Sequence, residues 1–169
     1  MYNYTTFISK KQAEDYHDPD TRESKIIISI TTPGDPNNPR EYSAYCKPAR
    51  LNEDTWKDIL RLEFHDIDPG HMNPDEPNGY KIFDEEQAVM VLKFLRAYQD
   101  HAFIAIVHCE AGISRSAAVS KFIAIIYSLQ FPDSYSIYNK HVFSTLTKLY
   151  NNCLYGDGPI PFEKLPGVL

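Results

Sequence analysis

The residues of this chain best suited to chemistry lie in one short segment, His108-Cys109-Glu110-Ala111-Gly112-Ile113-Ser114-Arg115-Ser116. Its cysteine follows an apolar, strand-like run over residues 103–107, and a long helical pattern follows its arginine. A strand–loop–helix junction of this kind binds anions, because backbone N–H groups at a helix N-terminus point at the ligand. The same field favours an ionised thiol. The segment therefore predicts a site that holds and attacks a phosphate-like dianion.

The elements that must position this segment alternate between strand-like and helix-like patterns, which indicates an α/β fold with a central, mostly parallel sheet flanked by helices. We expect strands over residues 4–8, 24–32, 60–65 and 103–107. A short helix is expected at Trp56, Ile59 and Leu60, before the third strand. The segment 67–83 is rich in Pro, Gly and Asn, and loops of that length are often functional.

Capping signals and apolar periodicity predict the other helices. Ser9 with Gln12, and Asp84 with Gln87, have the spacing of a capping box. The helix after Asp84 should end near residue 100. Its expected core stripe is Ala88, Val89, Leu92 and Leu95. Two further helices are expected over residues 116–129 and 136–150.

Composition limits the classes of function. The 169 residues fit a single domain over 1–169, with 156–169 as an irregular tail. A net charge of −6 without any basic run argues against nucleic-acid binding. No apolar stretch is long enough to span a membrane, so no membrane partner is expected. Three widely spaced cysteines are typical of a reducing compartment, so we expect a cytoplasmic protein.

The pattern His-Cys-x-x-Gly-x-x-Arg-Ser resembles the active-site signature of the cysteine-based protein tyrosine phosphatases. The form Ala-Gly-Ile-Ser-Arg-Ser and the chain length are most similar to the dual-specificity-type branch, which includes compact microbial and phage members. The resemblance is specific over the motif and the helix after it, and looser over residues 60–129. It implies a metal-independent enzyme without a cofactor that acts on phosphorylated proteins or peptides.

The chemistry of such an enzyme gives each fixed position a role. Cys109 is the expected nucleophile, and Arg115 the cation whose planar fork matches two phosphate oxygens. Gly112 allows the loop to turn its N–H groups inward. Ser116 can donate a hydrogen bond to the sulfur, and His108 is expected to order the loop. The phosphate-binding residues are then Glu110, Ala111, Gly112, Ile113, Ser114 and Arg115.

The general acid is expected from a loop after an upstream strand, as the resemblance implies. Residues 62–68, Leu-Glu-Phe-His-Asp-Ile-Asp, match that context. Asp66 follows the strand directly and is the first candidate, and Asp68 is the second. One carboxyl group there can protonate the leaving oxygen and then activate water.

Alternative interpretations of the motif are a structural cysteine beside a helix-capping arginine, and a zinc site using His108 and Cys109. Adjacent residues are poor co-ligands, which argues against zinc. Cys46 or Cys153 could serve as a resolving thiol for oxidised Cys109.

The leading function is hydrolysis of phosphotyrosine, with phosphoserine and phosphothreonine as further candidates. The alternatives are an RNA 5′-phosphatase, an inositol-lipid phosphatase, or an inactive phosphotyrosine-binding module. Glu110 is expected to repel additional negative charge and so to disfavour polyanions.

Overall fold

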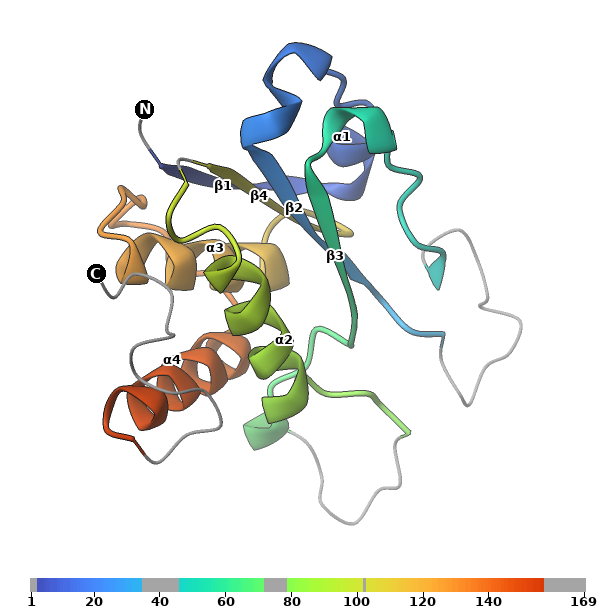
Figure 1. The fold of residues 1–169 in the computed structure, drawn as a ribbon. Helices are drawn as coiled ribbons and strands as arrows, with labels where there is room; N and C mark the ends of the chain where they lie inside the picture. The colour runs from blue at the N-terminus through green and yellow to red at the C-terminus, as the bar shows by residue number, and fades with distance from the viewer. Residues whose placement is uncertain (1–2, 35–45, 72–78, 102, 157–169) are drawn as a thin grey trace.

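The computed structural model describes residues 3–34, 46–71, 79–101 and 103–156, and these form an α/β fold (Figure 1). The strands are β1 (Tyr4–Ser9), β2 (Lys25–Thr31), β3 (Asp58–Glu63) and β4 (Ile104–Cys109). The helices are α1 (Lys10–Glu14), α2 (Glu85–Arg96), α3 (Arg115–Ile126) and α4 (Lys140–Leu154). Short 3-10 turns cover Pro19–Ser24, Glu53–Thr55 and Pro69–His71.

The four strands of the sheet have the order β1-β4-β2-β3, and all pairs among them are parallel. The expected α/β architecture with a flanked sheet is confirmed, and the described sheet is entirely parallel. Strand β2 lies between β4 and β3, and every one of its residues is buried. A run such as Ile26-Ile27-Ile28 suits this position, because a central parallel strand is covered on both faces.

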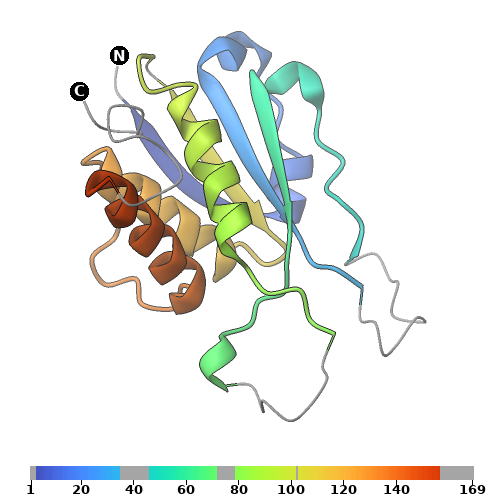
Figure 2. The same cartoon turned by 60° about the horizontal axis from the view of Figure 1, so that its bottom comes forward.

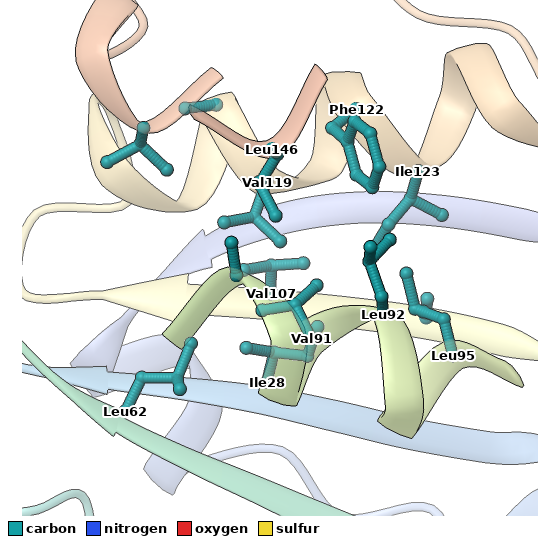
Figure 3. Packing of buried hydrophobic residues seen from close by; sticks show 14 of the residues in the cluster. Ile28, Leu62, Val91, Leu92, Leu95, Val107, Val119, Phe122, Ile123 and Leu146 are labelled. Atoms are coloured by element: carbon teal, nitrogen blue, oxygen red, sulfur yellow. The ribbon is translucent and has the colours of Figure 1, made fainter. Parts of the chain in front are cut away.

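Alternation along the strands divides the core between the two faces. The larger cluster joins Ile28 of β2 and Val107 of β4 to α2, α3 and α4. Figure 3 shows Val119 and Phe122 of α3 packed above these strands, with Leu92 of α2 beside them. The smaller cluster, on the opposite face, consists of Ala13, Ile27, Trp56 and Ile106. Residues adjacent in sequence therefore point to different layers of the protein.

Capping signals located the starts of α1 and α2. Both capping boxes are present: Ser9 caps α1 and Asp84 caps α2, each paired with the glutamine three residues on. Helix α4 starts four residues later than expected, because Asn139 is its N-cap and accepts a hydrogen bond from the Val142 N–H. Helix α3 ends at Ile126, before Ser128, whose φ of 54° is not helical.

The prediction of a short helix at Trp56, Ile59 and Leu60 is wrong. A single 3-10 turn precedes Trp56, and Ile59 and Leu60 lie in β3, which starts at Asp58. These two residues pair with Ile27 and Ile28 of β2. Pairing with a central strand satisfies backbone groups on one side of β3 and half-buries both side chains, and this tertiary context overrides the local pattern.

Because all strands of the sheet run in the same direction, their C-terminal ends meet at one edge. The segments that leave β2, β3 and β4 emerge together there (Figure 2). Open parallel sheets bind ligands outside the carboxyl ends of their strands. Of the long segment 67–83, residues 72–78 lie outside the described residues, as do 157–169 of the expected tail. None of the described helices has the length and apolar character needed to cross a bilayer.

Candidate active site

Cys109 is the last residue of β4 and is 2% exposed. Its Sγ lies 3.2 Å from the Oγ of Ser116, in the first turn of α3. Burial by itself raises the pKa of the thiol. Other influences outweigh burial and lower this pKa below its ordinary value: hydrogen bonds from Ser116 Oγ and from the backbone N–H groups of Ser116 and Ile113, and the charge of Arg115. The surroundings therefore favour a thiolate.

The loop between β4 and α3 is packed against the end of β1. Ser9 is the register partner of Cys109, and the Lys10 N–H donates to the Glu110 carbonyl at 3.2 Å. Gly112 has a φ of +69°, and a Cβ there would lie 2.3 Å from the Ser9 nitrogen. Only glycine fits this close approach and this conformation. The backbone of β1 thus shapes the loop around the sulfur.

Arg115 is 4% exposed, and backbone and side-chain acceptors from two neighbouring strand ends hold its guanidinium. Nη1 donates to the Phe64 carbonyl at 2.7 Å, and Nη2 donates to Thr32 Oγ1 at 2.8 Å. The Nε is also buried and has no hydrogen-bond partner among the described residues. A buried guanidinium with an unused donor beside a thiol is suited to an anionic ligand.

His108 points to the opposite face of the sheet from Cys109. Its Nε2 lies 2.7 Å from Ser29 Oγ of β2, within a hydrogen bond. Burial lowers the pKa of His108 to about 4, and the charges of Arg61 and Lys10 act in the same direction. The imidazole is therefore neutral at neutral pH, and its contact joins β4 to β2 just before the nucleophile.

Asp66 lies beyond the end of β3 and contacts the loop directly. Its Oδ1 accepts hydrogen bonds from Ser114 Oγ and Asn139 Nδ2, both at 2.8 Å. Asn139 is buried, and its own Oδ1 accepts from the Val142 N–H at the start of α4. The backbone N–H of Asn139 donates to the Ser114 carbonyl at 3.2 Å. Asp66 is therefore held beside the loop by α4 as well as by the loop.

Asp68 has a different environment. Its Oδ1 accepts the Gly70 N–H at 3.0 Å, at the 3-10 turn Pro69–His71. This is an ordinary turn contact of an aspartate. Of the two candidate acids, Asp66 alone has a hydrogen bond to the loop among the described residues. The geometry therefore favours Asp66.

Several residues of the site were not found by sequence reasoning. Asn139 is 73 residues from Asp66, and Thr32 is 83 residues from Arg115, so neither gives a local signal. Asn139 could have been recognised as a helix N-cap, because asparagine is favoured there, but its contact with Asp66 could not. Lys10 is the third residue of the site that sequence reasoning missed, and both its backbone N–H and its ammonium contact Glu110.

Cys109 and Cys153 are free thiols. Cys153 is buried in α4 within the larger core cluster. Cys46 Sγ lies 3.6 Å from the Pro33 carbonyl, a weak hydrogen bond. A resolving role for Cys46 or Cys153 stays a prediction.

Comparison of the chain with family models, with curated proteins and with solved structures finds no match. Within the described ranges, no three His, Cys, Asp or Glu side chains are grouped as metal ligands would be. The groups that the site brings together are a thiol with the backbone N–H groups of Ile113 and Ser116 beside it, a buried guanidinium and a carboxylate.

Proposed function

We propose that this chain is a cysteine-dependent phosphomonoesterase of the protein tyrosine phosphatase type, which hydrolyses phosphotyrosine through a phosphocysteine intermediate. Phosphoserine and phosphothreonine are further candidate substrates. The observation that carries the proposal is the environment of Cys109. Its thiol has a lowered pKa and lies next to Arg115, whose buried Nε has no partner among the described residues. A nucleophile and an anion-binding donor thus share one loop.

In the first step the Cys109 thiolate attacks phosphorus, and the bond from phosphorus to the leaving oxygen breaks. The N–H groups of the loop and the Arg115 guanidinium bind the phosphoryl oxygens and stabilise the charge that spreads over them. Asp66, as the carboxylic acid, gives its proton to the leaving oxygen. Its contacts with Ser114 and Asn139 support this role, because they fix the carboxyl group at the rim of the loop.

In the second step water attacks the phosphocysteine, and the phosphorus–sulfur bond breaks. The Asp66 carboxylate, which lost its proton in the first step, takes one from the attacking water. The departing sulfur becomes a thiolate again. The Ser116 hydroxyl, 3.2 Å from Sγ, donates a hydrogen bond to it and makes it a better leaving group.

Aromatic and apolar groups near the loop favour an aryl phosphate. Ile113, in the loop itself, is 46% exposed. The Tyr135 hydroxyl donates to the Ile113 carbonyl at 2.7 Å, and the Tyr135 ring packs edge-on against Phe7. Burial raises the pKa of Tyr135, and the negative charge of Cys109 adds to this, so the phenol lies within electrostatic range of the thiol. Such a rim suits the phenyl ring of phosphotyrosine.

Turnover of p-nitrophenyl phosphate in the presence of a chelator tests this proposal. We expect hydrolysis by the natural chain and none by Cys109→Ser, which lacks the nucleophilic sulfur. Binding of vanadate or phosphate to Cys109→Ser should persist, because the loop N–H groups and Arg115 are unchanged. Phosphate binding without turnover by the natural chain would contradict the proposal and indicate a phosphotyrosine-binding module.

A further inference from the structure

A groove of about 510 Å³ lies beside the nucleophile loop, where α1 meets the segment that precedes β3. The groove is lined by Lys10, Lys11, Glu14, Lys47, Pro48, Arg50 and Glu110. We refer to these residues as the Lys11 groove. Glu110 belongs both to the groove and to the loop, so the two sites are continuous.

The Lys11 groove is basic in an acidic protein. Four of its side chains are cationic and two are carboxylates, which gives a formal charge of +2. The whole chain carries −6, so cations are gathered here against the general trend. A patch of this sign attracts anionic groups and raises their local concentration.

Both carboxylates of the groove are already engaged. Glu14 Oε1 accepts the Arg50 backbone N–H at 2.9 Å, and Glu110 Oε2 lies 3.8 Å from the Lys10 ammonium. Lys10 also donates to the Lys47 carbonyl at 2.7 Å, which ties α1 to the facing segment. The expectation that Glu110 repels added negative charge is thus weakened, because Lys10 offsets that charge.

The remaining cations are available to a ligand. Lys11, Lys47 and Arg50 are exposed, and their side chains make no hydrogen bond or ion pair with the described residues. Lys11 lies in α1, which starts directly after Ser9, the register partner of Cys109. Paired strands lie about 4.8 Å apart, so the start of α1 lies close to the residue that would hold the phosphate.

We propose that the Lys11 groove binds acidic groups of a substrate peptide, carboxylate or phosphate, that lie close to its phosphotyrosine. This inference rests on the proposed function and extends it to the choice of substrate. A peptide suits the site better than RNA does. None of the described residues that line the groove is aromatic, so none of them offers a ring on which a base could stack, and its cations are interspersed with two carboxylates.

Binding to the Cys109→Ser chain tests the inference without depending on turnover. The probes are two phosphotyrosine peptides that differ only in flanking residues, one with glutamates and one with glutamines, and a third with a second phosphorylated residue. We expect about three- to tenfold tighter binding of the two acidic peptides, since each exposed ion pair contributes about 0.2–1 kcal/mol. The preference should shrink as salt is added.

The double substitution Lys11→Glu with Arg50→Glu should abolish that preference or reverse it. Lys93→Glu with Lys148→Glu, on α2 and α4, changes the net charge equally and serves as the matched control that keeps the preference. Equal affinity of the acidic and neutral peptides, or loss of the preference in the control, would overturn the inference. Tighter binding of a 5′-phosphorylated RNA than of any peptide would overturn it too. Turnover of both peptides at equal kcat/KM would overturn this inference and leave the proposed function standing.

Discussion

At the scale of single residues, the thiol of Cys109 is exceptional because it is buried and yet easier to ionise than an exposed cysteine. Burial opposes the thiolate, and the hydrogen bonds of Ser116 are the largest of the influences that oppose burial. Arg115 contributes its charge but is also held by Phe64 and Thr32. Ser116 is therefore the residue whose removal should change the sulfur most while leaving the phosphate-binding cation in place.

Ser116→Ala should raise the pKa of Cys109, because the thiolate loses a hydrogen-bond donor at 3.2 Å. The rate of alkylation by iodoacetamide, followed against pH, measures this directly. Ser120→Ala is the control: Ser120 is buried in the same helix but bonds to Thr5 of β1. An identical pH profile for natural protein and Ser116→Ala would show that the hydroxyl does not act on the sulfur.

Asp66→Asn should slow hydrolysis of an aryl phosphate by about 10²–10⁴-fold, since it removes the proton donor for the leaving oxygen. Asp68→Asn should change the rate little, because Asp68 supports the turn at Gly70. Steady-state kcat for both variants, over the acidic to neutral range, distinguishes the two. A large loss in Asp68→Asn with a small loss in Asp66→Asn would reverse the assignment.

At the scale of secondary-structure elements, the site depends on how β1 and α4 sit against one loop. The end of β1 packs against Gly112, and the start of α4 binds both Ser114 and Asp66. Strand β1 comes first in the chain and yet pairs with β4, the last strand of the sheet. The loop is thus clamped by elements from opposite ends of the sequence.

Gly112→Ala should cost both stability and activity, because its Cβ would lie 2.3 Å from Ser9 N and 2.4 Å from the Ile8 carbonyl carbon. Gly156→Ala is a matched control: its φ is +84°, also left-handed, but a Cβ there meets nothing within 4 Å. The control should lose only about 1 kcal/mol of stability. Urea unfolding and aryl phosphate turnover measure the two effects, and equal behaviour of the variants would contradict the close packing at β1.

The same elements show what sequence reasoning could and could not reach. The capping boxes at Ser9 and Asp84 were predictable, because a cap and its partner are three residues apart. The strand–loop–helix arrangement around Cys109 was predictable from one apolar run and one helical pattern. The contact of Asn139 with Asp66 was not, because it depends on how α4 docks against the end of β3. Ile59 and Leu60 were misassigned for the same reason, since pairing with β2 determines their structure.

At the scale of the whole molecule, β4 connects the chemistry to the stability of the fold. Cys109 belongs to the larger core cluster, under α2, α3 and α4. His108, its neighbour, is buried on the other face and bonds to Ser29 of the central strand. The site is therefore continuous with the core. Protonation of His108 should lower the stability of the whole sheet and not only that of the site.

The free energy of unfolding should fall as the pH is lowered from 6.5 to about 4, because burial depresses the native pKa of His108 from 6.5 to about 4. Over that window the unfolded chain binds a proton that the native chain does not, so stability rises with pH. The full shift corresponds to about 3 kcal/mol. Urea titrations of the natural chain and His108→Asn at several pH values measure it, and parallel curves would show that His108 does not contribute.

The central claim is that Cys109 forms a covalent bond to phosphorus during turnover. Rapid acid quenching of the protein with an aryl phosphate, followed by mass analysis of its peptides, tests this most directly. We expect one phosphoryl group on the peptide that contains Cys109. The phosphorylated form should accumulate to a higher level in a variant with a slowed second step, such as Ser116→Ala. Turnover with no phosphoryl group on that peptide, or with the group on another residue, would contradict it.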